Sequence, residues 1–301
     1  MSRWRRNRVA ALSACLILLG GCASAQQNAP EDGAGAAGER TVVSTSVAIC
    51  EILDELGYEQ VIGVPETENA LPERYQGVET VGAPMNPDLE IIKGLDPDLV
   101  LSPQTLEASL AEGYQAAGIT SAFLDLSSVE GMYAAITSLG EYLGCQDEAA
   151  RLNWEYESSL QRYQSQGSER VDVLLLMAFP DGFYLVATEN SYVGNLVKLA
   201  GGENVYGSQY RGDENGFANI NPEDMIQRDP DHILVFAHYA QEDAFQYMQS
   251  EFAQNGTWQH FAAVREGNVA YLPSEYFGMS ASLDWTQALE YLAPILGEGQ
   301  G

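Results

Sequence analysis

Short apolar runs alternate with stretches of helical spacing over most of this chain, and no other feature constrains the fold as strongly. Strands that alternate with helices predict parallel sheets covered by helices on both faces. The expected fold class is therefore α/β. The runs that we interpret as strands lie at residues 41–43, 61–64, 78–81, 99–101 and 122–124, and then at 171–177, 183–186, 233–236 and 269–272.

One long stretch without a strand interrupts the alternation. Residues 128–166 carry apolar side chains at helical spacing, which predicts two consecutive helices. We expect the second helix to be long and to link two lobes, each a mostly parallel sheet flanked by helices. The expected boundaries are an amino-terminal lobe at 41–145, a linking helix at 146–168 and a carboxyl-terminal lobe at 169–301.

A repeated detail supports two lobes of similar construction. Glu90 and Glu223 each lie seven residues before a Pro-Asp pair, at 97–98 and at 230–231, and each pair opens an apolar strand. The two glutamates are therefore expected at equivalent corners of the two lobes. Chance is the alternative, since Pro-Asp before a strand is common turn chemistry.

The amino terminus has the features of an export signal. Four arginines precede an apolar run at residues 9–19, which is too short to stay in the membrane as a spanning helix. Small residues then lead to Cys22, as in a bacterial lipobox, so we expect residues 1–21 to be removed and Cys22 to carry lipid. The alternative is ordinary signal cleavage near residues 23–25. Residues 22–40 would then form a flexible tether that holds the folded body at the outer face of the cell membrane.

The charge of the chain restricts its partners. The sequence holds 14 basic and 43 acidic residues, and loss of the signal removes four of the basic ones. Nucleic acid and anionic surfaces would be repelled by such a protein, so neither is an expected partner. The apolar content, 46%, is ordinary for a globular protein, and we expect a monomer.

Two cysteines, Cys50 and Cys145, remain in the folded part of the chain. Oxidation is possible in an exported protein, and the spacing of the two residues fits no metal-binding motif. A disulfide and a pair of buried thiols are both open, because a sequence does not give the distance between the two Cα atoms.

The apolar run at residues 233–240 ends on His238, which is followed by Tyr239. A buried parallel strand would deliver this imidazole to its carboxyl end, which is where open α/β sheets bind ligands. The alternative is a hydrogen-bonded structural histidine. The other two histidines, His232 and His260, are interpreted as structural.

Met85 lies between two prolines in the segment 82–88, which follows a predicted strand. Proline fixes φ on both sides, so the loop can hold the thioether in place at little further entropic cost. A thioether is a soft, neutral ligand that suits haem iron and not zinc or manganese. Partial burial of a loop methionine is the alternative. On the ligand interpretation, Met85 and His238 meet across a cleft between the lobes.

Several blocks of sequence resemble the haem-binding lipoproteins of the iron-regulated surface determinant system. The resemblance extends from residue 41 to about residue 293 and is densest at 82–103, 184–194, 200–205 and 258–261. That family belongs to the helix-linked, class III substrate-binding proteins of ABC importers, which also carry cobalamin and siderophores. The resemblance implies two Rossmann-like lobes joined by one long helix, haem as the transported ligand, an ABC permease as partner and no enzymatic activity. An upstream protein that donates haem is a further implied partner.

The resemblance also assigns roles to single residues. Met85 and His238 correspond to the two axial haem ligands. The backbone N–H groups of Ser46, Val47 and Ala48 correspond to the haem propionate site, and the start of a helix does offer unpaired donors and a positive dipole end. Relatives carry basic side chains just before the position of residues 71–72, whereas this chain has Glu68, Asn69 and Ala70 there. Arg74 is the candidate substitute.

Two further sets of residues follow from the resemblance. Glu90 and Glu223 match acidic residues that dock on arginines of the permease; the alternative is a solvated glutamate that favours the helix dipole. Aromatic side chains suited to contact a porphyrin would otherwise lie in the core or at its rim. These haem pocket candidates are Tyr239, Tyr276, Phe277 and Tyr192.

Two rival functions are considered. A siderophore or cobalamin carrier would keep the fold, but siderophore sites need basic side chains and few are present. An enzyme is the rival from another class. The sequence holds no Gly-x-Ser-x-Gly elbow, no His-Glu-x-x-His motif and no phosphate-binding loop. Two protein ligands on a haem iron would also leave no open position for oxygen.

Overall fold

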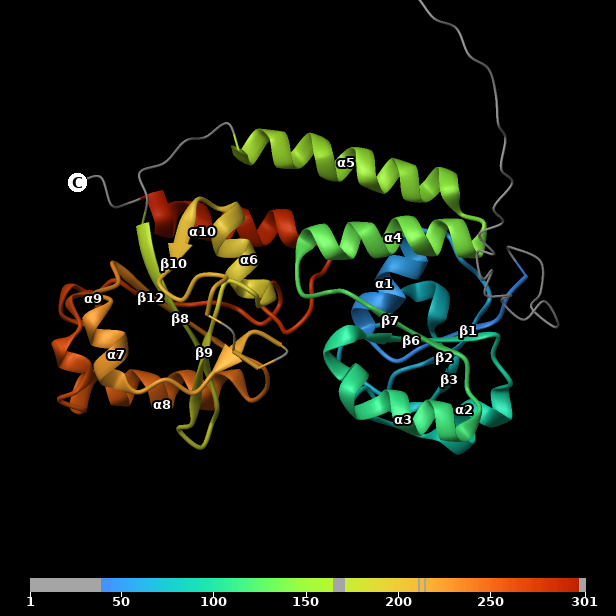
Figure 1. Ribbon diagram of the computed structural model, residues 1–301, viewed down its shortest axis with the longest axis horizontal. Helices are drawn as coiled ribbons and strands as arrows, with labels where there is room; N and C mark the ends of the chain where they lie inside the picture. The colour runs from blue at the N-terminus through green and yellow to red at the C-terminus, as the bar shows by residue number, and fades with distance from the viewer. Residues whose placement is uncertain (1–38, 165–170, 211, 214, 298–301) are drawn as a thin grey trace, which may run out of the picture. The chain divides into compact units, whose positions relative to one another are not determined.

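The computed structural model describes residues 39–164, 171–210, 212–213 and 215–297 (Figure 1). The predicted signal, Cys22, most of the tether and the last residues of the predicted linking helix lie outside the described residues. Within the described ranges, no helix combines the length and apolar character needed to cross a bilayer.

The first lobe is built on a sheet of parallel strands in the order β3-β2-β1-β6-β7. Side chains alternate between the two faces. Val42 and Leu101 pack on the side of α1 and α4, while Val43 and Val100 pack with α2 and α3. The elements of this lobe are β1 (Val42–Ser44), α1 (Val47–Glu55), β2 (Val61–Val64), η1 (Glu73–Tyr75), β3 (Glu79–Thr80), β4 (Gly82–Ala83), β5 (Asn86–Pro87), α2 (Leu89–Leu95), β6 (Leu99–Pro103), η2 (Gln104–Leu106), α3 (Glu107–Ala117), β7 (Ser121–Leu124) and α4 (Val129–Leu143).

The second lobe has a mixed sheet in the order β11-β9-β8-β12-β13, and β10 pairs with the first half of β8. The strand β9 is antiparallel to β8, whereas β12 and β13 are parallel to it. Helices α6 and α10 cover one face of this sheet, and α7, α8 and α9 cover the other (Figure 1). The elements are β8 (Val171–Ala178), β9 (Tyr184–Ala187), α6 (Tyr192–Leu199), β10 (Gly202–Asn204), β11 (Phe217–Ala218), α7 (Pro222–Gln227), β12 (His232–Ala237), α8 (Gln241–Gln254), η3 (Trp258–His260), α9 (Ala262–Glu266), β13 (Val269–Tyr271) and α10 (Trp285–Gly297).

The two consecutive helices predicted at residues 128–166 are confirmed as α4 and α5 (Gln146–Gln164). Ser128 caps the first helix by accepting a hydrogen bond from the N–H of Gly131. The second helix contacts both lobes through its tyrosines. Tyr156 stacks on Tyr133 of α4, with 4.3 Å between ring centroids, and the hydroxyl of Tyr163 donates to the carbonyl of Thr286 in α10 over 3.2 Å. The domain boundaries themselves stay a prediction.

The repeat found in the sequence has a structural counterpart. Asp98 and Asp231 each stand just before a central strand, β6 or β12. The carboxylate of Asp98 accepts a hydrogen bond from the backbone N–H of Thr41 over 2.8 Å, and that of Asp231 accepts one from the N–H of Asp172 over 2.9 Å. In both cases the aspartate's own N–H donates back to the carbonyl of the same neighbour. The same clamp therefore fixes the entry of the central strand in each lobe.

The two cysteines are free thiols, so the disulfide considered from the sequence is not formed in this structure. Cys50 is buried on α1, and burial raises the pKa of its thiol to about 11. Cys145 is partly buried at the start of α5, and desolvation raises the pKa of this thiol as well. Both therefore stay protonated near neutral pH and pack as small apolar side chains.

Candidate functional site

His238 is the first residue after β12, at the carboxyl edge of the second sheet. The strand expected at 233–236 is β12 (His232–Ala237), and the apolar run at 233–240 continues three residues beyond its end. The pairing of Ala237 with Ala178 places His238 across from Phe179, the residue that follows β8. The sequence therefore placed the imidazole at the correct end of the strand.

The His238 side chain is exposed to solvent, yet neighbouring protein atoms displace enough water from around the ring to change its pKa. Desolvation lowers its pKa from the ordinary histidine value. A lowered pKa keeps the imidazole neutral at physiological pH, and a neutral imidazole has the free nitrogen lone pair that a metal ligand needs. Its closest aromatic neighbour is Tyr239, with 6.3 Å between ring centroids.

The chain turns into α8 directly after Tyr239, and the turn is strained. Ala240 has φ of 45° and ψ of 47°, in the left-handed region. This conformation costs a residue with a Cβ about 1–2 kcal/mol. The strained residue lies two positions after His238, where the chain leaves β12 and enters α8.

Met85 lies at the tip of a small hairpin instead of in an irregular loop. Gly82 pairs with Pro87, and Ala83 pairs with Asn86, so that Pro84 and Met85 form a two-residue turn between β4 and β5. The side chain of Met85 is 70% exposed, so the alternative of partial burial is wrong. A hairpin tip presents the thioether to solvent on a defined backbone.

Met85 and His238 belong to different lobes. Within the described part of the chain, no hydrogen bond joins the two side chains. Their approach across a cleft stays a prediction. Both side chains are, however, exposed at the ends of ordered elements, which is the presentation that an iron ligand requires.

The start of α1 differs from the starts of several other helices. Ser46 is the N-cap residue, but its side chain makes no capping hydrogen bond. In contrast, Asp88, Ser128, Ser191 and Asn221 each accept a hydrogen bond from a first-turn N–H of their own helix. The side chain at the N-cap of α1 therefore does not occupy the first-turn donors around Val47 and Ala48, and the positive end of the helix dipole lies there.

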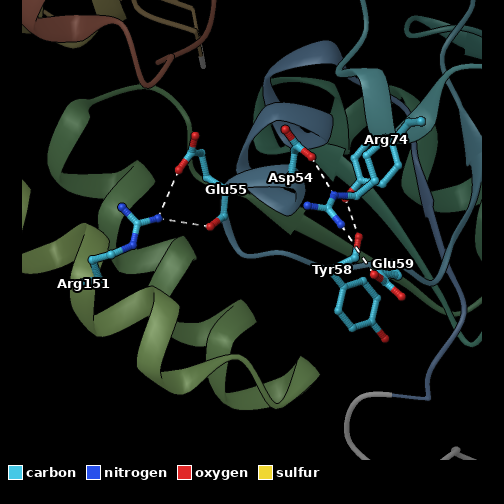
Figure 2. Close-up of polar contacts among 7 residues, drawn as sticks. Asp54, Glu55, Tyr58, Glu59, Arg74 and Arg151 are labelled. Atoms are coloured by element: carbon cyan, nitrogen blue, oxygen red, sulfur yellow. Dashed lines mark hydrogen bonds and ion pairs between the residues drawn. The ribbon is translucent and has the colours of Figure 1, made fainter.

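Arg74 does not fit the role suggested for it. Its Nε lies 2.7 Å from Oδ1 of Asp54, and a second guanidinium nitrogen lies 3.7 Å from Oε1 of Glu59 (Figure 2). Asp54 belongs to the last turn of α1, about 12 Å from the first turn where Ser46 begins the helix. Arg74 is therefore engaged at the wrong end of α1 to assist an anion bound at its start.

Arg151 of α5 also approaches the carboxyl-terminal end of α1. One of its terminal nitrogens lies 3.1 Å from Oε2 of Glu55 and 3.3 Å from the Glu55 carbonyl (Figure 2). The other lies 3.0 Å from Oε1 of Glu155. A cation at this end complements the negative pole of the helix dipole. These arginines connect α1 to its neighbours, and they leave its first turn without a basic partner among the contacts described here.

Glu90 and Glu223 occupy matching positions. Each is the second residue of a short helix, α2 or α7, and both side chains are exposed. Each helix leads into an aspartate in the left-handed region, Asp96 or Asp229, and then into the Pro-Asp pair. The equivalence predicted from the sequence is visible in the backbone. Docking on a permease stays a prediction.

The four aromatic pocket candidates divide into two groups. Tyr239 is 55% exposed and lies beside His238, and Tyr276 is half-buried. Tyr192 and Phe277 are buried in the core below α6 and α10, and Phe277 has no exposed surface. Because neither buried ring offers a surface to a ligand, the interpretation of Tyr192 and Phe277 as pocket residues is replaced by a role in packing.

The sequence interpretation missed a second aromatic group. Phe179 and Phe183 flank the turn between β8 and β9, and the ring of Phe179 lies 5.9 Å from that of Tyr239. The signal was present in the sequence, because Asp181-Gly182 is typical turn chemistry and a phenylalanine lies on either side of it. In the described ranges, no group of three or more His, Cys, Asp or Glu side chains is arranged to hold a metal ion.

Comparison with known proteins identifies related chains. A model of the periplasmic binding protein family matches residues 42–276. The high-affinity heme uptake system protein IsdE of Staphylococcus aureus is 36% identical over 258 residues, which cover 85% of this chain and 86% of the relative. The structure of S. aureus IsdE complexed with heme superposes with a TM-score of 0.78 at 35% identity, covering 86% of this chain and 99% of that one. An ABC transporter substrate-binding protein from Listeria monocytogenes reaches a TM-score of 0.80 at 40% identity, covering 86% and 98%.

Proposed function

The chain belongs to the periplasmic binding protein family, and from this membership we propose that it binds haem outside the cell membrane and delivers it to an ABC permease for iron acquisition. The protein makes and breaks no bond in its cargo. The support comes from the similarity to a heme uptake protein over most of both chains and from the chemistry of two exposed side chains, Met85 and His238.

The single observation that carries the proposal is the presentation of one neutral ligand by each lobe. Met85 projects a thioether from the tip of a hairpin, and His238 offers an imidazole whose pKa is lowered. A thioether and an imidazole together form a ligand pair that haem iron accepts in proteins. We therefore assign Met85 and His238 as the two axial ligands of the haem iron.

The haem propionates are assigned to the start of α1. The backbone N–H groups of Val47 and Ala48 lie at the positive end of the helix dipole, where the N-cap side chain does not compete for them. The N–H of Ser46 belongs to the same assignment, and in this structure it donates to Oγ of Ser44 over 3.4 Å. In a chain with a formal net charge of −29, this local field is what favours an anionic group. Arg74 is left out of the assignment because it pairs at the other end of the helix.

The remaining roles concern the partners. Glu90 and Glu223 would meet arginines of the permease and fix the register of docking, because rim charges act more on orientation and association rate than on affinity. Lipid on Cys22 would hold the monomeric protein at the outer face of the cell membrane, where an upstream protein can pass haem to it.

An absorbance titration tests the proposal. Mature protein titrated with ferric haem should develop the Soret band of a six-coordinate, low-spin iron. Met85→Ala and His238→Ala should each shift this band and speed haem loss, whereas His260→Ala, the matched histidine control, should leave both unchanged. The proposal is overturned if the wild-type protein binds a ferric siderophore or cobalamin and does not bind haem, or if neither ligand variant alters the spectrum.

A further inference from the structure

A row of aromatic rings continues from His238 along the carboxyl edge of the second sheet. The ring of Tyr239 follows His238, the ring of Phe179 lies 5.9 Å from that of Tyr239, and the ring of Phe183 lies 5.6 Å from that of Phe179. We call Phe179, Phe183 and Tyr239 the aromatic row. It joins two strand ends, because Phe179 follows β8 and Tyr239 lies beyond β12.

The aromatic row leaves much apolar surface in water. Phe183 is 46% exposed and Tyr239 is 55% exposed, while Phe179 is half-buried against the core. Single exposed apolar residues are common on protein surfaces, but adjoining ones mark sites of contact with a ligand or a partner. Here the adjoining rings start directly at the residue assigned as an iron ligand.

The turn that carries two of the rings is held rigidly. The N–H of Phe179 donates to the carbonyl of Phe183 over 2.9 Å, the N–H of Gly182 donates to the carbonyl of Phe179 over 3.1 Å, and the N–H of Phe183 donates to Oδ1 of Asp181 over 3.2 Å. The rings are therefore placed by hydrogen-bonded backbone. Little backbone entropy therefore remains to be lost when a ligand contacts the turn.

The same turn is also anchored on α8. Gly182 has a φ of +85°, and a Cβ at this position would lie 2.3–2.6 Å from atoms of the Tyr247 ring. Only glycine satisfies both the backbone conformation and this close approach. Tyr247 therefore packs against the turn from the side of α8.

We propose that the aromatic row is the apolar wall of the haem site on the His238 side: Phe183, Phe179 and Tyr239 contact the porphyrin and exclude water from the bond between iron and imidazole. This inference rests on the proposed function, since it takes haem as the cargo. A porphyrin is a large, flat, apolar ring system with charge only at its propionates, and aromatic side chains supply apolar area with few rotatable bonds. With the propionates assigned to the start of α1, the apolar part of the ligand is left for the wall.

The wall would protect the bond between the haem iron and His238 from water, which the two axial ligands alone do not do. An iron–histidine bond that is open to water exchanges its ligand readily, and an apolar shell around a metal site controls solvent access to it. Phe183 is the informative member of the row, because its exposure means that truncation removes ligand contact at little cost in packing.

The experiment measures haem loss from the full mature holoprotein to an excess of an apo-haem-protein acceptor. Phe183→Ser should speed haem loss about tenfold, the factor that corresponds to the lost burial of one aromatic ring on a ligand. The Soret position should stay at its wild-type value because both axial ligands remain. Phe183→Tyr keeps the ring and should restore slow loss.

Trp154→Ser is the matched control, because Trp154 is 68% exposed on α5 and lies outside the aromatic row. It should lose haem at the wild-type rate. Tyr239→Ser should accelerate loss and Tyr239→Phe should not, which provides a second test if Phe183→Ser folds poorly. Wild-type protein that binds no haem would overturn the proposed function itself. Wild-type protein that binds haem, together with Phe183→Ser and Tyr239→Ser variants that lose it at the wild-type rate, would overturn only the wall.

Discussion

The two lobes start their central strands in the same way and end them differently. Before β6 and before β12 stands the same Asp-Pro-Asp sequence, with its first aspartate in the left-handed region and its last aspartate clamped to the neighbouring strand. At the other end, β12 leads directly to His238, whereas β6 leads into η2 and the first lobe presents Met85 on a separate hairpin. The common part fixes the sheet, and the divergent part carries the assigned ligands.

This difference follows from the physics of open α/β sheets. The amino ends of the strands need only a stable turn, so that one solution can serve both lobes. The carboxyl ends form the edge where ligands bind, and their loops determine which chemistry is presented. A strand end places its side chain more firmly than a two-residue hairpin does, so the contributions of His238 and Met85 are expected to be unequal.

The largest expected effect is the loss of haem from variants of His238, which should exceed the loss from variants of Met85. His238→Ala should speed haem loss at least about a hundredfold, since changes in outer-shell partners of a metal alone cost about 10–100-fold. Met85→Ala should have a smaller effect, about tenfold, because a thioether is a weaker ligand on a more exposed support. Stopped-flow transfer of haem to an acceptor measures both rates.

Met85→Leu separates ligation from apolar contact in the same assay, because leucine keeps a similar volume and lacks the sulfur. It should behave like Met85→Ala if the sulfur binds iron. A greater loss from the Met85 variants than from His238→Ala would reverse the comparison and make the hairpin the dominant anchor.

The equivalence of the strand entries can be broken by mutation. Asp98→Ala should lower the free energy of unfolding by about 2 kcal/mol, and Asp231→Ala by about 1 kcal/mol. Hydrogen bonds to charged groups contribute about 1.5–3 kcal/mol to stability, and solvent exposure of the carboxylate reduces this contribution. The carboxylate of Asp98 accepts an additional bond from the hydroxyl of Thr41 over 3.1 Å, which the exposed Asp231 clamp does not share.

Urea unfolding of the apoprotein measures these differences. Asp98→Asn and Asp231→Asn keep an acceptor oxygen and serve as the matched controls, with smaller losses expected for both. Equal losses for the two alanine variants would mean that the Thr41 hydroxyl adds nothing, and a larger loss at Asp231 would contradict the ranking.

The pH dependence of the second lobe gives a further test. The pKa of His238 is lower in the folded protein than in the unfolded chain, because desolvation disfavours the imidazolium. The unfolded state therefore takes up a proton at a higher pH than the folded state, and stability falls as pH drops below the ordinary histidine pKa of about 6.5 toward the folded value. Above that window the group contributes no slope.

Comparison of wild type with His238→Gln over this pH range isolates the contribution. The wild-type apoprotein should lose more stability between pH 7.5 and pH 5.5 than the variant does. Haem binding should stay constant with pH down to the same window, because the imidazole is still neutral there. A variant with the same pH profile as wild type would show that His238 does not titrate as its surroundings imply.

The framework of the fold could be predicted because it depends on long, periodic segments. The strand at residues 61–64 and the helix pair at 128–166 agree with β2, α4 and α5 to within a few residues. These segments bury whole faces, and their apolar spacing follows directly from the geometry of strands and helices. The repeated Pro-Asp pair was equally visible because turn chemistry is local.

Other elements were hidden for physical reasons. The helix α8 starts with Gln241-Glu242-Asp243, which resembles a loop, and buries only Ala244, Met248 and Phe252 along one face. Its true start is set by the left-handed Ala240, a conformation for which alanine gives no signal. The hairpin at Met85 has two residues in each strand, too few for an alternating pattern to be recognised.

Local sequence signals predicted the two candidate ligands, Met85 and His238, but did not predict the aromatic row. A histidine at the end of an apolar strand is a local signal, and so is a methionine between two prolines. Whether an aromatic ring faces solvent or the core depends on tertiary packing: Tyr192 and Phe277 are buried in the core, Phe179 packs partly against it, and Phe183 is exposed. Aromatic rings bury well in either place, so composition alone does not separate the two cases.

The smallest expected effect concerns the turn that follows His238. The described residues with positive φ that are not glycine are Asp96, Asp229 and Ala240. Aspartate tolerates the left-handed region, whereas alanine has no polar side chain to stabilise it there. Ala240→Gly should relieve about 1–2 kcal/mol of strain and cost about 0.5–1 kcal/mol in backbone entropy, giving a net stabilisation of up to about 1 kcal/mol. Thermal unfolding of the apoprotein measures the gain, and Asp229→Gly, the control in which no comparable strain exists, should give none. If Ala240→Gly also speeds haem loss, the strained alanine holds His238 in position, and the second lobe maintains its ligand geometry at the expense of stability.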